Sequence, residues 1–184
     1  MMENNDYQDL IDFWFSERAE KMWFDSTPAF DSELKQNFES IYLKALNGEL
    51  EHWKKDALGA LALVILFDQI PLNIYRKQKE SFQTESRARD IAEEAIDKKL
   101  DEQLAPKQRM FLYMPYMHSE SLSDQNKSVE LFENANMMEN AEYARHHKKI
   151  VARFGRFPHR NAILGRESTD EEKEYLNSDK AFLG

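Results

Sequence analysis

The sequence contains no cysteine, and it has only five glycines and five prolines among its 184 residues. Without cysteine the chain forms neither disulfides nor thiolate-ligated metal sites, and it suits a reducing compartment. So few glycines and prolines disfavour a turn-rich β fold. With 41% hydrophobic and 32% charged residues, the composition favours helices with solvated outer faces. At this length we expect a single domain, residues 1–184.

Long apolar runs are also missing. The longest spans residues 57–67 and includes Gly59, whereas a helix needs about 20 apolar residues to cross a bilayer. The first six residues are acidic and lack the apolar core of a secretion signal. The formal net charge of −9 disfavours general binding to nucleic acid or to anionic membranes. We therefore expect a cytoplasmic protein that binds neither nucleic acid nor membranes, and the sequence does not predict its oligomeric state.

Apolar residues recur at helical spacing along most of the chain. These stripes predict helices over residues 7–15, 28–46, 57–69, 84–96, 106–114, 123–133, 141–154 and 168–176. The segment 57–69 is apolar on every side, so other elements should cover it all round. We expect Pro71 to end that helix and Pro115 to close the one that begins at Pro106.

Together these elements predict an all-α fold of seven to eight helices with no strand. Consecutive helices joined by short links pack antiparallel, so we expect stacked antiparallel helical hairpins in a tetratricopeptide-like arrangement. No clean internal match is found near a period of 34 residues. Any repeats are therefore degenerate.

The most unusual stretch is residues 153–161, which read Arg-Phe-Gly-Arg-Phe-Pro-His-Arg-Asn. Between Arg145 and Arg166 the chain holds seven Lys/Arg, three of its five histidines and no acid. Elsewhere, 18 cationic side chains face 34 acidic ones, a formal charge of −16. A cationic segment in so acidic a chain requires anionic partners, either internal carboxylates or a ligand.

Two interpretations of this stretch remain open. Arg153, Arg156 and Arg160 carry forked donors that suit carboxylate or phosphate, so they would line a pocket for a small anionic molecule or an acidic peptide end. In the other interpretation they belong to a structural network, neutralised by Asp68, Glu120 and the acids after residue 167. Base stacking beside the phenylalanines would suit nucleic acid, but the negative charge elsewhere disfavours it.

The triplet His118-Ser119-Glu120 lies in a break between predicted helices. With Asp68 or His159 it would supply general acid–base chemistry, although no nucleophile-elbow pattern is present. Alternatively, Ser119 or Glu120 caps the following helix while His118 bonds a backbone carbonyl.

Metal binding is not predicted. Adjacent His146 and His147 lie about 100° apart on a helix, and no recognised ligand spacing occurs. We expect neither a metal nor a cofactor. His147 falls on an apolar stripe, which predicts a core histidine whose ring N–H is hydrogen-bonded.

Asp68 ends the all-apolar segment, so its carboxylate should be buried. A buried carboxylate is costly unless a cation pairs with it. We expect its partner to be Arg76 or one of the arginines of residues 153–160.

Several segments resemble the domain of unknown function 924 family, and together they span about residues 10–176. They are Leu66–Arg76 (Leu-Phe-Asp-Gln-Ile-Pro-Leu-Asn-Ile-Tyr-Arg), His118–Glu120, Arg153–Arg166 and the aromatic segments Phe13–Phe15, Trp23–Phe24 and Phe30–Asp31. The resemblance implies an all-α, tetratricopeptide-like fold in mostly bacterial proteins, and it implies no reaction. One departure is Leu72, where the family usually has a basic residue.

The leading hypothesis is an uncharacterised helical-hairpin domain that binds a small anionic molecule or peptide carboxylate. The expected ligand-binding residues are Asp68, Gln69, Arg76, Arg153, Arg156, Arg160 and Asn161. The alternative is a hydrolase- or lyase-type enzyme in which His118 or His159 is the general base, Glu120 or Asp68 orients it, and arginines stabilise negative charge. A purely structural protein-interaction module would lack such a pocket.

Overall fold

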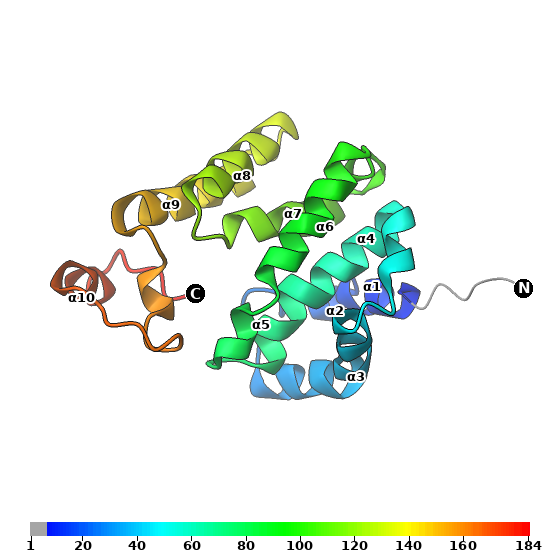
Figure 1. Ribbon diagram of the computed structural model, residues 1–184, viewed down its shortest axis with the longest axis horizontal. Helices are drawn as coiled ribbons and strands as arrows, with labels where there is room; N and C mark the ends of the chain where they lie inside the picture. The colour runs from blue at the N-terminus through cyan, green and yellow to red at the C-terminus, as the bar shows by residue number, and fades with distance from the viewer. Residues whose placement is uncertain (1–6) are drawn as a thin grey trace, which may run out of the picture. The chain divides into compact units, whose positions relative to one another are not determined.

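A computed structural model describes residues 7–184 and shows an all-helical chain (Figure 1). No strand occurs among these residues, so the predicted all-α class is confirmed. Contacts group them into two compact units: the first comprises residues 7–76 and 80–115, and the second residues 77–79 and 116–184. The first six residues, which are acidic and lack the apolar core of a secretion signal, lie outside the described residues. The single domain and the tetratricopeptide-like stacking stay predictions.

The first unit is built around helices α1 to α7. Their bounds are α1 Gln8–Trp14, α2 Glu17–Glu20, α3 Pro28–Leu46, α4 Ala57–Val64, α5 Ile70–Ile74, α6 Glu85–Asp97 and α7 Pro106–Met117, the last of which runs on into the second unit. Helix α3 begins where the Thr27 side chain accepts the N–H of Phe30, with Pro28 in the first turn. It ends before Gly48, whose φ of 80° suits glycine, as the sequence predicts.

Helices α4 and α5 join through a π-helical turn, η2 (Ile65–Gln69), into one continuous helix. Pro71 therefore does not end this helix, and that prediction is wrong. Pro71 has no N–H to give the Phe67 carbonyl four residues earlier, and the Thr84 hydroxyl donates to that carbonyl instead at 2.6 Å. The Ile70 N–H reaches the Ile65 carbonyl in the wider turn. Tertiary contacts thus replace the hydrogen bond that the proline removes.

By length and composition, residues 57–74 form the one segment of the described chain that would be able to cross a membrane, with a mean hydropathy of 1.8. However, 89% of this segment is buried in the fold, and α3 and α6 pack against it. Such burial is typical of the core helix of a soluble protein.

Pro115 does not close α7 either, because the helix continues to Met117 with the proline inside it. The prediction fails because Tyr116 and Met117 are buried. Burial of two large side chains offsets a single lost backbone hydrogen bond.

The second unit contains the hairpin α8 (Leu122–Asn134) and α9 (Met138–Phe154), joined by three residues (Figure 1). Helix α9 begins three residues earlier than predicted and ends, as predicted, at Gly155, whose φ is 71°. A short 3-10 helix, η5 (Pro158–Arg160), and α10 (Asp170–Leu176) follow.

The residues Ser168-Thr169-Asp170-Glu171-Glu172 predict two capping boxes, Thr169 with Glu172 and Ser168 with Glu171, and helix α10 starts with the first of them. Thr169 and Glu172 each bond the other's backbone N–H, at 3.2 and 2.8 Å. The second predicted box, which begins at Ser168, is not seen: its hydroxyl accepts the Asn161 amide instead. The core of this unit consists of Ile150, Val151, Phe157 and Tyr175, with Phe154, Leu176 and Phe182 packed against it.

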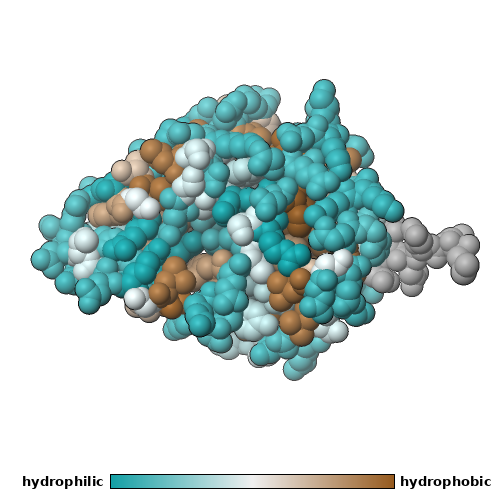
Figure 2. All heavy atoms as spheres, in the orientation of Figure 1, coloured by the Kyte–Doolittle hydropathy of each residue, from teal (hydrophilic) through white to brown (hydrophobic). Residues whose placement is uncertain are grey.

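The face drawn in Figure 2 is mainly hydrophilic, with apolar side chains in separate patches. This pattern agrees with the charged composition and with helices whose outer sides meet water.

Gly59 permits a close approach of α4 to the 3-10 helix η1 (Glu51–Lys55), because a Cβ there would lie 2.2 Å from the Trp53 carbonyl oxygen. In an open helix, Gly→Ala stabilises by about 1 kcal/mol. We predict that Gly59→Ala instead lowers the free energy of unfolding by about 3 kcal/mol, measured by denaturant titration. Gly165→Ala is the comparison, since its φ is 67° but nothing lies within 4 Å; it should cost only about 1 kcal/mol. A stabilised Gly59→Ala variant would contradict the contact.

Candidate functional site

The cationic stretch lies in the second unit, and two of its arginines pair with acids of α10. Arg156 forms a bidentate ion pair with Glu172, with Nε–Oε1 2.7 Å and Nη2–Oε2 2.8 Å. The Glu172 side chain is only 2% exposed, whereas Arg153 and its partner Glu171 are both exposed. The first pair therefore fixes α10 to the stretch, and the second adds little.

Arg166 forms a second bidentate pair, with Glu120. Its Nη1 and Nη2 atoms lie 2.7 and 2.9 Å from the carboxylate oxygens, and the Phe157 N–H donates to the same carboxylate at 2.8 Å. Burial alone would raise the pKa of Glu120, but the bonds from Arg166 and Phe157 outweigh it and lower that pKa. Glu120 is thus an ionised clamp on the turn after α9.

The Ser119 hydroxyl shapes the start of α8. It donates to Asp124 at 2.5 Å and accepts the Ser121 N–H. The fully buried Gln125 adds two bonds at 2.7 Å, to the carbonyls of Met117 and Ser119. Sequence reasoning did not find Gln125, because a lone glutamine on a helix carries no motif. His118 lies half-buried in the same break.

Two histidines of this unit are largely withdrawn from water. His147 on α9 is buried, and its Nδ1–H donates to the Tyr143 carbonyl at 2.8 Å, which confirms the predicted core histidine. His159 lies in η5, and its Nδ1 is buried without a hydrogen-bond partner among residues 7–184. The ring of Phe182 lies against both imidazoles, with centroids 4.5 and 5.0 Å away.

Burial lowers the pKa of His147 and of His159 to about 4. Neighbouring groups act in the same direction: Arg160 on both rings, the imidazoles of His118 and His146 on His147, and Arg166 and the His147 imidazole on His159. The Tyr143 carbonyl and the Glu120 carboxylate oppose them, one at each ring. Both histidines are therefore neutral at pH 7.

Arg160 and Asn161 are both buried in the segment that follows. The Arg160 guanidinium lies over the Phe157 ring, 4.8 Å from its centroid. Asn161 donates to Ser168, while its Oδ1 has no hydrogen-bond partner among the described residues, and the same is true of Arg166 Nε. Buried polar atoms are nearly always hydrogen-bonded in native proteins, so this segment has unused hydrogen-bonding capacity.

The other three predicted ligand-binding residues lie in the first unit. Asp68 and Gln69 are buried in the π-helical turn, where the Gln69 amide donates to Asp68 at 2.6 Å. Arg76, one expected partner of Asp68, forms an ion pair with Asp31 of α3 at 2.7 Å and donates to Asn73. Arg76 therefore ties α5 to α3. The predicted ligand-binding residues are thus divided between the two units.

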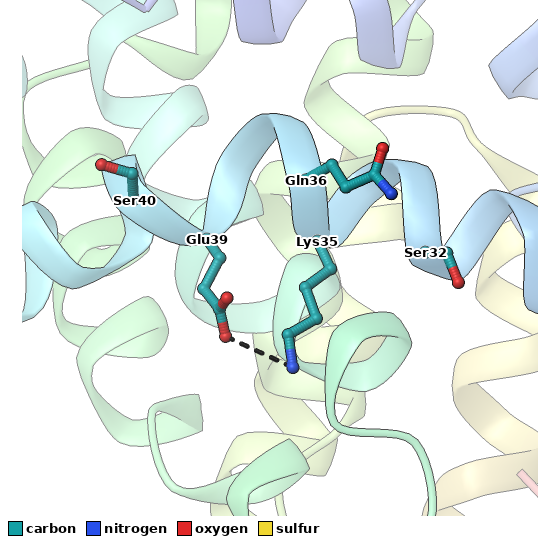
Figure 3. Close-up of a pocket in the computed structure, with 5 residues that line it drawn as sticks. All are labelled: Ser32, Lys35, Gln36, Glu39 and Ser40. Atoms are coloured by element: carbon teal, nitrogen blue, oxygen red, sulfur yellow. Dashed lines mark ion pairs between the residues drawn. The ribbon is translucent and has the colours of Figure 1, made fainter.

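A surface depression lies on α3, lined by Ser32, Lys35, Gln36, Glu39 and Ser40 (Figure 3). Lys35 and Glu39 neutralise each other across 3.6 Å. None of the predicted site residues lines this depression, so it is a poor candidate for the site.

Within the described range, no three His, Asp or Glu side chains lie close enough to hold one metal ion. The candidate site consists of hydrogen-bonding side chains and rings, namely Arg160, His159, Asn161 and the adjoining His147.

Comparison with known proteins matches nearly the whole chain. A family model described as bacterial protein of unknown function (DUF924) matches residues 10–180. A solved structure of a protein of unknown function, ATU0120 from Agrobacterium tumefaciens, aligns with a TM-score of 0.88 at 37% sequence identity, covering 93% of this chain and 96% of that one. No curated protein matches.

The contrast between the two arginines that face α10 is testable. We predict that Arg156→Ala lowers the free energy of unfolding by about 3 kcal/mol, because it leaves the Glu172 carboxylate buried without its bidentate partner. Arg153→Ala, the matched control, should cost about 0.5 kcal/mol or less. Denaturant titration at pH 7 measures both, and equal losses would contradict the structural role of the first pair.

The histidines predict a dependence of stability on pH. Their pKa values are about 4 in the fold and about 6.5 in an unfolded chain, so between these values the unfolded chain binds more protons. The stability they confer is full above pH 6.5 and is lost as the pH falls toward 4, by about 3 kcal/mol for each histidine. Glu172, with a pKa of about 2, loses its contribution only below about pH 4.5.

Denaturant titration between pH 7 and pH 4, together with NMR titration of the rings, measures this effect. His147→Gln and His159→Gln should each flatten the pH dependence. His52→Gln is the control, because His52 is exposed and should leave the dependence unchanged. Ring pKa values near 6.5 in the native protein would refute the prediction.

Proposed function

We propose that this chain, which belongs to the DUF924 family of bacterial proteins of unknown function, binds a small anionic molecule or peptide carboxylate through its second unit. We place the site at Arg160, His159 and Asn161. The sequence alone pointed to a larger set of arginines. Arg153 and Arg156 now have a structural task, since both pair with acids of α10.

One observation carries the proposal: buried polar atoms of His159, Asn161 and Arg166 have no hydrogen-bond partner among residues 7–184. Leaving such an atom unsatisfied costs about 1–3 kcal/mol. Oxygen atoms of a ligand would accept from Arg166 Nε and from His159 Nδ1–H, a hydroxyl or N–H of the ligand would donate to Asn161 Oδ1, and a planar carboxylate fits a guanidinium fork.

The local electrostatics favour an anion over a cation. Arg160 and Arg166 both lower the pKa of His159, so the potential at this ring is positive on balance despite Glu120. Burial strengthens such interactions because little water is present to screen them. A cationic ligand would meet repulsion at the same place.

The catalytic alternative has less support. Both oxygens of Glu120 already accept hydrogen bonds, from Arg166 and from the Phe157 N–H. This carboxylate therefore holds the turn after α9 and does not serve to orient an imidazole. A pKa of about 4 also makes His159 a weak base at pH 7. We accordingly propose binding rather than hydrolysis or elimination, in a cytoplasmic setting.

Thermal-shift measurements with inorganic phosphate and with acetate test the proposal. We expect one or both to raise the melting temperature of the wild-type protein and of Arg153→Ala, relative to chloride at the same ionic strength. Arg160→Ala should abolish this rise. Arg160→Lys should weaken it, because the charge is kept while the planar fork is lost.

Ring NMR gives an independent reading. A bound anion should raise the pKa of His159 in the wild-type protein, since it offsets the neighbouring arginines. If neither anion shifts the melting temperature or the His159 resonance, the proposed anion site is wrong.

A further inference from the structure

Four rings surround the side chain of Phe182. The centroid of Phe182 lies 4.5 Å from that of His147, 5.0 Å from His159, 6.2 Å from His146 and 6.4 Å from Phe157. The three histidine contacts are edge-to-face, the arrangement that aromatic pairs favour. We call His146, His147, Phe157 and His159 the aromatic cage.

Phe182 lies in the segment of residues 178–184, which we call the tail. Few contacts attach this tail to the rest of the second unit. The Phe182 N–H donates to the Tyr175 hydroxyl at 2.9 Å, and a turn bonds Ala181 N–H to the Ser178 carbonyl. Residues 177–180 and 183–184 are exposed, so Phe182 is the one large side chain of this tail that enters the unit. A segment held by one ring and a few bonds opens at low free-energy cost.

The tail also follows the surface of the candidate site. A Cβ at Gly184 would lie 3.1 Å from the Nε2 and Cδ2 atoms of His159, so the backbone passes directly against that imidazole. Beneath it, Phe157 supports both the cage and the Arg160 guanidinium, which lies over its ring. The tail therefore covers the same histidine that we place in the anion site.

We propose that residues 178–184 occupy, in cis, a receptor for the aromatic residue of a peptide, and that a peptide carrying such a residue displaces them. This inference deepens the proposed function and rests on the same segment, since a peptide carboxylate would reach Arg160 while its aromatic ring fills the cage. Neutral imidazoles and a phenylalanine give the cage an apolar, aromatic lining that suits a ring rather than a charged side chain.

Occupancy by the tail sets the affinity that a second peptide would show. A tethered segment acts at an effective concentration in the millimolar range, so it competes with any free peptide. The apparent affinity of the receptor is reduced by the fraction of molecules in which the cage is open. Removing the Phe182 ring should restore that affinity.

The test uses the full chain with Phe182→Ala and the heptapeptide Ser-Asp-Lys-Ala-Phe-Leu-Gly, the sequence of residues 178–184, with a free or an amidated C-terminus. We expect calorimetry to show binding to Phe182→Ala about tenfold or more tighter than to wild type. The same peptide with alanine in place of phenylalanine should not bind. Leu183→Ala, whose side chain is exposed, is the matched control and should behave like wild type.

Three outcomes would overturn the inference. They are no binding of the heptapeptide to Phe182→Ala, equal binding to wild type and variant, and binding that does not need the phenylalanine. NMR of the His147 and His159 rings verifies that the cage has opened, since both pKa values should rise in the variant. If Phe182→Ala fails to fold, Phe182→Leu replaces it, because leucine keeps the apolar contact without the aromatic ring.

Comparing the peptide with a free C-terminus and the peptide with an amidated one distinguishes this inference from the proposed function. If amidated and free peptides bind equally well and phosphate and acetate have no effect, the anion site fails while the aromatic receptor stands. If the small anions act through Arg160 but no aromatic peptide binds Phe182→Ala, the receptor fails while the anion site stands.

Discussion

The second unit depends most on the hydrogen bonds that the Glu120 carboxylate accepts. It receives both Arg166 donors and the Phe157 N–H, so it fixes the turn after α9 at two points nine residues apart. Phe157 in turn contacts His147 and His159 and lies beneath Arg160. A single partly buried carboxylate thereby positions the aromatic and cationic groups of the candidate site, and the pair between Arg156 and Glu172 secures α10 against the same stretch.

The first unit solves a different problem, which is how to bury polar groups inside an apolar helix. The π-helical turn places Asp68 and Gln69 in the interior. Side chains donate to two backbone carbonyls of the turn, Thr84 to that of Phe67 and Asn73 to that of Gln69. Turns of this kind cost stability in isolation and recur at functional sites. Here the polar groups are supported by α5 and α6, so the turn is a defined feature of the core.

Local sequence patterns predicted helix ends correctly where the interactions that end or begin the helix are themselves local. Gly155 and the Thr169–Glu172 capping box gave correct helix ends, because a left-handed residue and a reciprocal cap act within one turn. Pro71 misled because its missing hydrogen bond is replaced by a residue far along the chain. The charge pattern showed that the arginines need anions, but the pairing of each with its carboxylate is set by tertiary packing. The contact of Phe182 with the histidines was not predicted, because a single aromatic residue in a polar segment forms no motif and no periodic pattern.

The proposed anion site and the tail are coupled through the protonation of the histidines. With Phe182 in place, burial keeps His147 and His159 neutral, so the attraction for an anion comes from the arginines alone. If the ring leaves, we expect water to reach both imidazoles and their pKa values to rise toward about 6.5, so that a fraction of each is protonated at pH 7. That charge strengthens the attraction, so displacement of the tail favours an anion and a bound anion favours displacement by the same free energy. A peptide whose ring refills the cage would bury both imidazoles again, so only a small anion such as phosphate would gain from this coupling.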